Sequence, residues 1–364
     1  MGPGNRCRRR RLGRTWRHDQ RCNLNLPGRE THDMNAPVRL KTSAMIASIA
    51  AEGQRTIAAP FGNALAKAAE TRPNIVGMTA DLGKYTDLHI FQQAHPDRFY
   101  QMGMAEQLLL MSAAGMAREG FQPWVTTYAV FAARRAYDFL CLAIAEEDLD
   151  VKVCCALPGL TTGYGPSHQA TEDIAIFRGM PSLTIIDPCD AVEIDQATTA
   201  LADHRGPVYM RLLRGKVPAM LDEYGYQFEL GKAKMIRDGA DVLVISSGLM
   251  TMRALETADA LKADKIDVAV LHVPTIKPLD EATILAAAGA KPGRLVVVAE
   301  NHTVIGGLGE AVAGAMMRAG VYAPFRQVAL PDAFLEAGAL PTLHDRYGIS
   351  TSAMSANIKG WLAQ

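Results

Sequence analysis

The stretch Arg98-Phe-Tyr-Gln-Met-Gly-Met-Ala-Glu-Gln107 joins a short predicted strand, 98–102, to a helix that we expect to begin at Glu106 and end near residue 118. Strand and helix patterns alternate in the same way from about residue 62 to residue 213. This alternation is typical of an α/β fold in which a mainly parallel, doubly wound sheet carries helices on both faces. We predict further strands at 74–79, 124–128, 151–157, 183–186 and 208–213, and helices at 64–70 and 132–145.

A polar stretch at 214–238 has no strong period, and we interpret it as a linker between two domains. A smaller three-layer α/β domain follows at 239–364. Its predicted elements are strands at 241–248, 267–273 and 295–300 and a helix at 250–263. The cluster Gly306-Gly-Leu-Gly309 lacks the G-x-G-x-x-G order, so we attribute its glycines to close packing of a helix on a sheet rather than to phosphate binding.

The composition is that of a globular protein, because 49% of the 364 residues are hydrophobic and 21% are charged. The longest apolar runs are far shorter than the roughly 20 residues that a membrane span needs. No Cys-x-x-Cys pair occurs among the six cysteines, which argues against a metal site or a disulfide framework and favours a reducing cytoplasm. Cys154 and Cys155 are adjacent in a predicted strand, so they are expected to face opposite sides of the sheet.

The zero net charge hides a basic head. Residues 1–33 carry nine arginines against three acidic residues, a balance of +6, and the rest of the chain carries −6. This head lacks both the apolar core of a secretory signal and the amphipathic pattern of a transit peptide. We interpret it as disordered upstream sequence read from a misplaced start, with translation beginning at Met34 and a lead-in at 34–54, rather than as a nucleic-acid-binding arm.

Two short motifs carry the chemistry. Gly103-Met-Ala-Glu-Gln107 places the Glu106 carboxylate at the start of a helix, and Gly165-Pro-Ser-His-Gln169 places His168 on a Gly-Pro loop. A carboxylate and an imidazole suit proton transfer near neutral pH. Taken singly, Glu106 could simply compensate the positive end of the helix dipole, and His168 could be structural.

Together, these motifs resemble the transketolase family. Residues 98–107 resemble its "RF…GIAEQ" segment, 165–169 its "GPTHQ" loop, 211–218 its arginine segment and 271–280 its C-terminal domain signature, and the likeness runs from about residue 55 to residue 348. The resemblance implies a thiamine-diphosphate-binding, pyrimidine-type domain at 55–213 and a transketolase C-terminal domain at 239–364. It also implies a transferase that moves a two-carbon ketol unit between sugar phosphates.

The family's cofactor contacts carry over to four positions. Glu106 is expected to bind N1′ of the aminopyrimidine of thiamine diphosphate. Phe131, in preference to Tyr128, is expected to stack on that ring, although either could be an ordinary core residue. Asp81 matches a family segment that lies near the cofactor at the subunit interface.

The family's substrate contacts carry over only in part. His168 is expected to contact the ketose and relay a proton from its hydroxyl, and Arg214 to grip the terminal phosphate. Tyr164 stands where full-length transketolases have an acidic residue that meets a sugar hydroxyl, and Ala156 where they have a second phosphate-contacting histidine. These departures predict an altered sugar preference, with a branched sugar phosphate such as apulose 4-phosphate as a candidate.

The Gly-Asp-Gly…Asn segment that holds the magnesium diphosphate in the family is missing from this sequence. The resemblance therefore implies the C-terminal-half subunit of a split transketolase. Its partner, an N-terminal-half subunit, would supply the Mg²⁺ ligands in an α2β2 assembly with the active site at the interface. Neither a nucleic acid nor a membrane is expected as a partner.

Two alternatives stay open. The β subunit of a 2-oxo acid dehydrogenase E1 component has the same two-domain plan, but its loop usually reads like "GPxHSQ", and Arg214 suits a sugar phosphate better. A non-catalytic assembly subunit would have no need of both Glu106 and His168.

Overall fold

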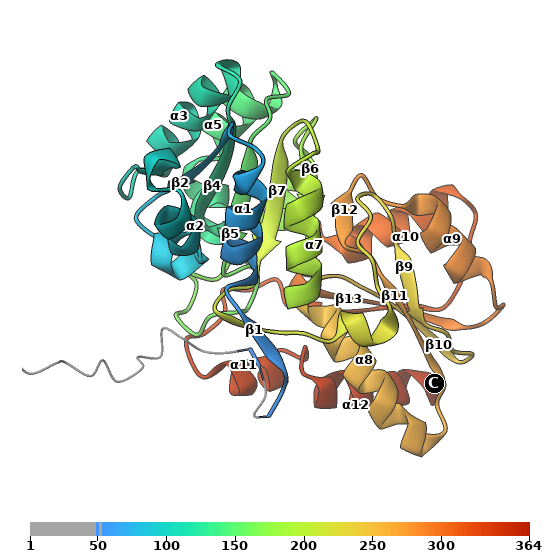
Figure 1. Ribbon diagram of the computed structural model, residues 1–364. Helices are drawn as coiled ribbons and strands as arrows, with labels where there is room; N and C mark the ends of the chain where they lie inside the picture. The colour runs from blue at the N-terminus through green and yellow to red at the C-terminus, as the bar shows by residue number, and fades with distance from the viewer. Residues whose placement is uncertain (1–48, 51–52) are drawn as a thin grey trace, which may run out of the picture. The chain divides into compact units, whose positions relative to one another are not determined.

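The computed structural model describes residues 49–50 and 53–364, which contain two large β-sheets with helices packed on both faces of each sheet (Figure 1). All of these residues belong to one packed unit, Thr42–Gln364. The predicted Arg-rich head at 1–33 and most of the lead-in at 34–54 lie outside the described residues.

The first sheet has seven strands in the order β12-β6-β7-β5-β4-β2-β3, and all neighbours are parallel except β12, which runs antiparallel to β6. Its strands are β2 (Ile75–Thr79), β3 (Phe99–Gln101), β4 (Gln122–Tyr128), β5 (Lys152–Ala156), β6 (Thr184–Ile186), β7 (Val208–Leu212) and β12 (Thr275–Lys277). One face packs against α1 (Pro60–Glu70), α2 (His89–Ala94) and α7 (Ala191–Leu201). The other packs against α3 (Glu106–Arg118), α4 (Ala129–Arg135), α5 (Tyr137–Leu140) and α6 (Asp173–Arg178).

The second sheet has five strands in the order β14-β13-β10-β11-β9, with β9 antiparallel to β11. Its strands are β9 (Lys234–Arg237), β10 (Val242–Ser246), β11 (Val268–His272), β13 (Leu295–Thr303) and β14 (Phe325–Leu330). One face carries α8 (Leu249–Leu261), α11 (Leu340–Arg346) and α12 (Thr351–Leu362), and the other carries α9 (Glu281–Gly289) and α10 (Leu308–Arg318). Among the described helices none is both long and apolar enough to span a bilayer.

The predicted α/β class is confirmed, as are a mainly parallel first sheet and a second α/β unit. Helix α3 begins and ends where the sequence predicts. Cys154 belongs to the hydrophobic cluster on one face of the sheet and Cys155 to the cluster on the other. The glycine cluster packs closely, since a Cβ at Gly307 would lie 2.0 Å from Glu300 Oε2.

The predicted single helix at 132–145 is wrong. Helix α4 ends at Arg135, because Ala136 adopts φ −128° and ψ 15° outside the helical region, and α5 is followed by a π-helical turn, Cys141–Ala145. No glycine or proline marks this break, and Ala136 is fully buried, so tertiary packing determines it. The break leaves Arg135 at the end of α4.

The stretch 214–238, predicted as a linker, contains regular secondary structure. Its strand β8 (Lys216–Pro218) pairs antiparallel with β1 (Thr56–Ala58), a 3₁₀ turn follows at Leu221–Tyr224, and β9 joins the second sheet. Strand β12 follows β11 of the second domain in the sequence, but it pairs with β6 at the edge of the first sheet. The second domain therefore contributes one strand to the first sheet.

A buried ion cluster joins the two domains at the end of β7. Arg211 donates from Nε and Nη2 to the two carboxylate oxygens of Asp173, at 2.9 and 3.0 Å, and from Nη1 to Asp187 at 3.1 Å. Its Nη2 also donates to the backbone oxygen of Asn301 in β13 at 3.0 Å. All three side chains of the ion cluster are at most 5% exposed, so removal of the cation would leave two buried carboxylates without its counter-charge.

We therefore predict that Arg211→Met lowers the free energy of unfolding by about 3–5 kcal/mol, because breaking a buried pair strands its partners. Urea denaturation followed by circular dichroism measures this change. The matched control is Arg318→Met, which removes a pair with Glu281 that is largely exposed and should cost about 0–1 kcal/mol. Equal effects of the two substitutions would contradict the role given to Arg211.

Candidate functional site

The residues predicted for the site gather at the carboxyl edge of the first sheet. In this sheet β2 lies between β4 and β3. The chain leaves β2 toward one edge of the sheet, to β3, and leaves β4 toward the other edge, to β5. This reversal makes a topological switch point between β2 and β4. Open α/β sheets bind ligands at such a point, outside the carboxyl ends of their strands. The strands and the site residues that follow or end them are β2 with Asp81, β3 with Glu106, β4 with Tyr128 and Phe131, and β7 with Arg214.

Glu106 is the first residue of α3 and its side chain is 6% exposed. Gly103, with φ 73°, turns the chain between β3 and this helix, and Gln101 Oε1 accepts from the Gly103 amide at 3.0 Å. The helix dipole favours a carboxylate at this end. Arg135 Nη1 donates to Glu106 Oε1 at 3.0 Å.

The same guanidinium covers the ring of Phe131. Arg135 follows Phe131 by one helical turn in α4, and its Cζ lies 3.8 Å from the ring centroid. Its side chain is half exposed. Glu106 and Phe131 therefore flank one space, which the flat guanidinium of Arg135 fills.

His168 lies in a cluster of aromatic rings. Its ring centroid is 5.5 Å from that of Phe131, 6.0 Å from that of Tyr128 and 5.4 Å from that of Tyr164, each in an edge-on arrangement. Burial, with a further contribution from the charge of Arg135, lowers the pKa of His168 below 6.5. The imidazole is accordingly neutral at pH 7, as a proton acceptor must be.

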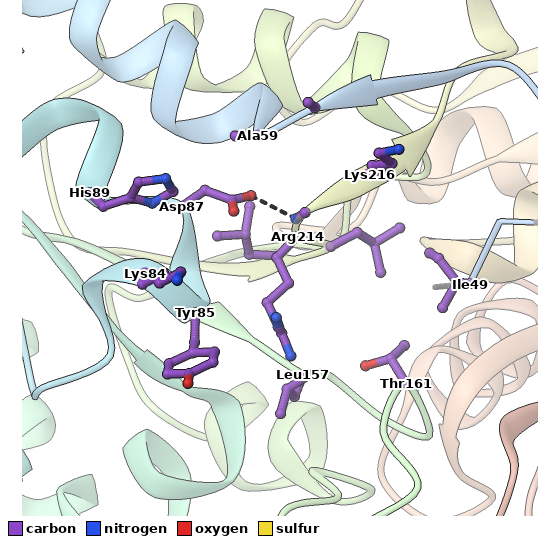
Figure 2. A pocket seen from close by; sticks show the side chains of 14 residues that line it. Ile49, Ala59, Lys84, Tyr85, Asp87, His89, Leu157, Thr161, Arg214 and Lys216 are labelled. Atoms are coloured by element: carbon purple, nitrogen blue, oxygen red, sulfur yellow. Dashed lines mark hydrogen bonds between the residues drawn. The ribbon is translucent and has the colours of Figure 1, made fainter. Parts of the chain in front are cut away.

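A pocket of about 380 Å³ lies between the 3₁₀ turn Gly83–Thr86 and the segment after β7 (Figure 2). Arg214 reaches into it beside Leu157, and its Cζ lies 5.9 Å from the ring centroid of Tyr85. The carboxylate of Asp87 accepts from the Gly215 amide at 2.9 Å, and burial raises the pKa of Asp87. The other charged or titratable groups lining the pocket are Lys84, His89 and Lys216. Cationic side chains therefore outnumber the single carboxylate.

The structure thus brings together Tyr128, Phe131, Tyr164 and His168 through ring contacts, and links Glu106 to Phe131 through Arg135. Burial raises the pKa of the Tyr128 and Tyr164 hydroxyls, and the nearby charge of Arg214 partly offsets this rise.

Asp81 is exposed, and its backbone φ is 59°. Its carboxylate accepts a hydrogen bond from Gln101 Nε2 at 3.0 Å. Ala156 ends β5 and is fully buried. Within residues 49–50 and 53–364, no three His, Cys, Asp or Glu side chains come together as metal ligands.

Sequence reasoning missed three residues of this region. Arg135 could have been found, since a cation one turn after Phe131 in a helix lies on the same face. Tyr85 and Asp87 enter the site because the chain forms a 3₁₀ turn after β2, which no pattern in the sequence signals.

Both domains match known family models. Residues 54–220 match the transketolase pyrimidine-binding domain, and residues 231–354 match the transketolase C-terminal domain. The transketolase family protein y4mN of Sinorhizobium fredii is 76% identical over 89% of this chain and 94% of its own length. The 6-deoxy-6-sulfo-D-fructose transketolase subunit SqwH of a Clostridium species is 36% identical over 78% of this chain and 87% of its own length.

Among solved structures, a split-gene transketolase described as an inactive β4 tetramer superimposes with a TM-score of 0.76 at 35% identity, over 85% of this chain and 99% of that one. A 1-deoxy-D-xylulose-5-phosphate synthase of Synechococcus is 34% identical over 82% of this chain, which spans 46% of the synthase. Both family domains match in order, and two of these relatives align over 87% and 94% of their own length, so the chain belongs to the transketolase family.

Proposed function

We propose that this chain is one subunit of a split, thiamine-diphosphate-dependent transketolase that transfers a two-carbon ketol unit between sugar phosphates. The observation that carries the proposal is the space between Glu106 and Phe131, next to His168 and at the switch point of the sheet. A 2-oxo acid dehydrogenase subunit would share the fold, but a pocket lined by three cationic side chains, Lys84, Arg214 and Lys216, suits a phosphate dianion better than the single negative charge of a 2-oxo acid.

The residues present fit the aminopyrimidine of thiamine diphosphate. Arg135 occupies the space with a planar group that donates to Glu106 and stacks on Phe131. An aminopyrimidine is also planar and can make the same two contacts. When bound, the cofactor supplies carbanion chemistry at its thiazolium ring, and the protein supplies position and electrostatics.

We assign the following roles to the chain's own residues. Glu106 holds a proton at N1′ of the aminopyrimidine, and Phe131 fixes the plane of that ring. His168, neutral at pH 7, accepts a proton from a substrate hydroxyl. Arg214 binds the anionic end of the sugar, and Tyr164 replaces the acidic residue of full-length transketolases beside its hydroxyls.

The remaining parts of the site are proposed to come from a partner, an N-terminal-half transketolase subunit that binds Mg²⁺ and diphosphate in an α2β2 complex. Three apolar side chains near Glu106 are exposed, namely Met104 (80%), Leu108 (53%) and Met111 (47%). An apolar patch of this kind suits a protein interface. The names of the split-gene tetramer and of the subunit SqwH support a heteromeric enzyme. We also propose a cytoplasmic location, in which the buried Cys154 and Cys155 stay reduced.

The first test is calorimetric titration of thiamine diphosphate with Mg²⁺. We expect no tight binding to this chain alone and tight binding when it is mixed with a subunit carrying the Gly-Asp-Gly…Asn segment, because the two subunits share the ligands. Chelation of Mg²⁺ by EDTA should abolish binding in the mixture. Equally tight binding to the isolated chain would overturn the shared site.

The second test is Glu106→Gln in the reconstituted complex. We expect ketol transfer to fall by about 10²- to 10⁴-fold, since the amide cannot exchange a proton with N1′. The matched control is Glu119→Gln, an exposed residue just beyond the end of α3, which should keep normal turnover. Near-normal turnover of Glu106→Gln would show that another group binds N1′.

The third test is Arg135→Met, which removes the group that occupies the aminopyrimidine space. A half-exposed ion pair and a cation–π contact are together worth about 1–1.5 kcal/mol, so the affinity of the complex for thiamine diphosphate should rise about 5- to 10-fold. Arg118→Met, which loses an exposed pair with Glu147, is the control and should leave the affinity unchanged. Weaker binding by Arg135→Met would mean that Arg135 helps to hold the cofactor.

A further inference from the structure

The loop that carries His168 is anchored on the second domain. Leu160, fully buried near the start of this loop, donates its amide to Asn301 Oδ1 at 2.9 Å. Its carbonyl oxygen lies 2.8 Å from His344 Nε2, which donates to it. Both polar groups of one backbone residue in the first domain are therefore satisfied by side chains of the second, Asn301 at the end of β13 and His344 in α11.

Three more hydrogen bonds follow the loop to its far end. The Gly338 amide donates to the Gly163 carbonyl at 3.0 Å, and Gln169 Nε2 donates to the Glu336 carbonyl at 3.2 Å. Just after the loop, the Thr303 amide donates to the Thr171 carbonyl at 2.8 Å. Tyr164 and His168 lie between these anchors, so the second domain fixes the loop on both sides of them.

The contact between loop and domain leaves no room for a side chain at two glycines. A Cβ on Gly163 would lie 2.0 Å from the Gly338 carbonyl oxygen, and a Cβ on Gly159 would lie 2.1 Å from the Asn301 carbonyl oxygen. Backbone packs directly on backbone at both points. Small displacements of the second domain are therefore transmitted to the loop rather than absorbed by flexible side chains.

Asn301 and His344 are themselves held firmly. The carbonyl of Asn301 accepts from Arg211 Nη2 at 3.0 Å, and its side-chain Oδ1 accepts from the Leu160 amide at 2.9 Å. Both residues are at most 3% exposed. A buried amide or imidazole that makes such a bond is costly to leave unpaired, so each contact has one preferred geometry.

We propose that Asn301 and His344 are positioning residues for the substrate step, acting on His168 through the backbone of Leu160. This inference rests on the proposed function for its effect on turnover, but the restraint on the loop is a property of the chain itself. The second domain thereby contributes to the reaction without touching the substrate. Positioning is worth much to a catalyst, since misplacement by about 1 Å can cost about 10²-fold in rate.

The test pairs a variant that removes each hydrogen bond with one that keeps it. Asn301→Leu and His344→Leu remove the bonds, whereas His344→Gln keeps an amide donor near the position of Nε2 and Asn301→Asp keeps an acceptor. Asn357→Leu, an exposed asparagine of α12, is the matched control. The reconstituted complex is used throughout, with hydrogen exchange of the peptide spanning residues 158–171 measured by mass spectrometry.

We expect Asn301→Leu and His344→Leu to speed exchange of this peptide about tenfold or more and to lower kcat about 10- to 100-fold. The dissociation constant of thiamine diphosphate should stay within about twofold, because Glu106 and Phe131 are carried by α3 and α4 rather than by the loop. His344→Gln should recover most of both losses, and Asn357→Leu should show neither.

Several results would overturn the proposal. Unchanged exchange in both leucine variants would remove the restraint, and faster exchange with normal kcat would remove its role in catalysis. A loss that His344→Gln does not recover, or equal loosening of peptides throughout the chain, would indicate plain destabilisation. If the wild-type complex shows no ketol transfer, the proposed function fails, and the exchange of the loop still decides whether Asn301 and His344 restrain it.

Discussion

The rest of the structure depends on one buried cation, Arg211. Its guanidinium donates to both oxygens of Asp173, to Asp187 and to the carbonyl of Asn301. Removing such charges from water is compensated only when the partners are complete and well oriented. Arg211 therefore links β7 to α6, to the segment after β6 and to β13. One of its partners, the Asn301 carbonyl, belongs to the second domain.

The same segment of sequence gives two arginines opposite tasks. Strand β7 ends at Leu212, so Arg211 is still in the strand and lies on the same face of the sheet as Tyr209, whose hydroxyl also donates to Asp173 at 2.6 Å. Arg214 lies beyond the strand, where the chain has turned out of the sheet toward the pocket (Figure 2). Burial, rather than residue type, distinguishes the arginine that stabilises the fold from the one that lines the pocket.

Periodicity and spacing were enough to predict the parallel sheet, the second α/β unit and the extent of α3, because those features follow from local hydrophobic pattern. The family resemblance assigned His168, Phe131 and Tyr128 to one site, and their rings do lie against one another. What both missed depends on tertiary contacts: the break at Ala136, the addition of β12 to the first sheet, and the turn that brings Asp87 to the pocket. Asp81 was placed near the cofactor by resemblance, and its role stays a prediction, since its carboxylate pairs with Gln101.

The end of β13 shows most clearly why the two domains act together. Glu300, Asn301, His302 and Thr303 are consecutive, polar and at most 8% exposed, and burial of polar groups favours partners within the protein. Glu300 accepts the first amides of α10, and burial raises its pKa to about 7. His302 Nε2 accepts from the Ala175 amide in α6, while burial lowers its pKa to about 4. The register between β13 and β14 shifts between Ala299 and Thr303, which frees this segment from a regular ladder. These four residues of β13 therefore connect α10 to the ion cluster, to the His168 loop and to α6. The position of the loop depends on these contacts.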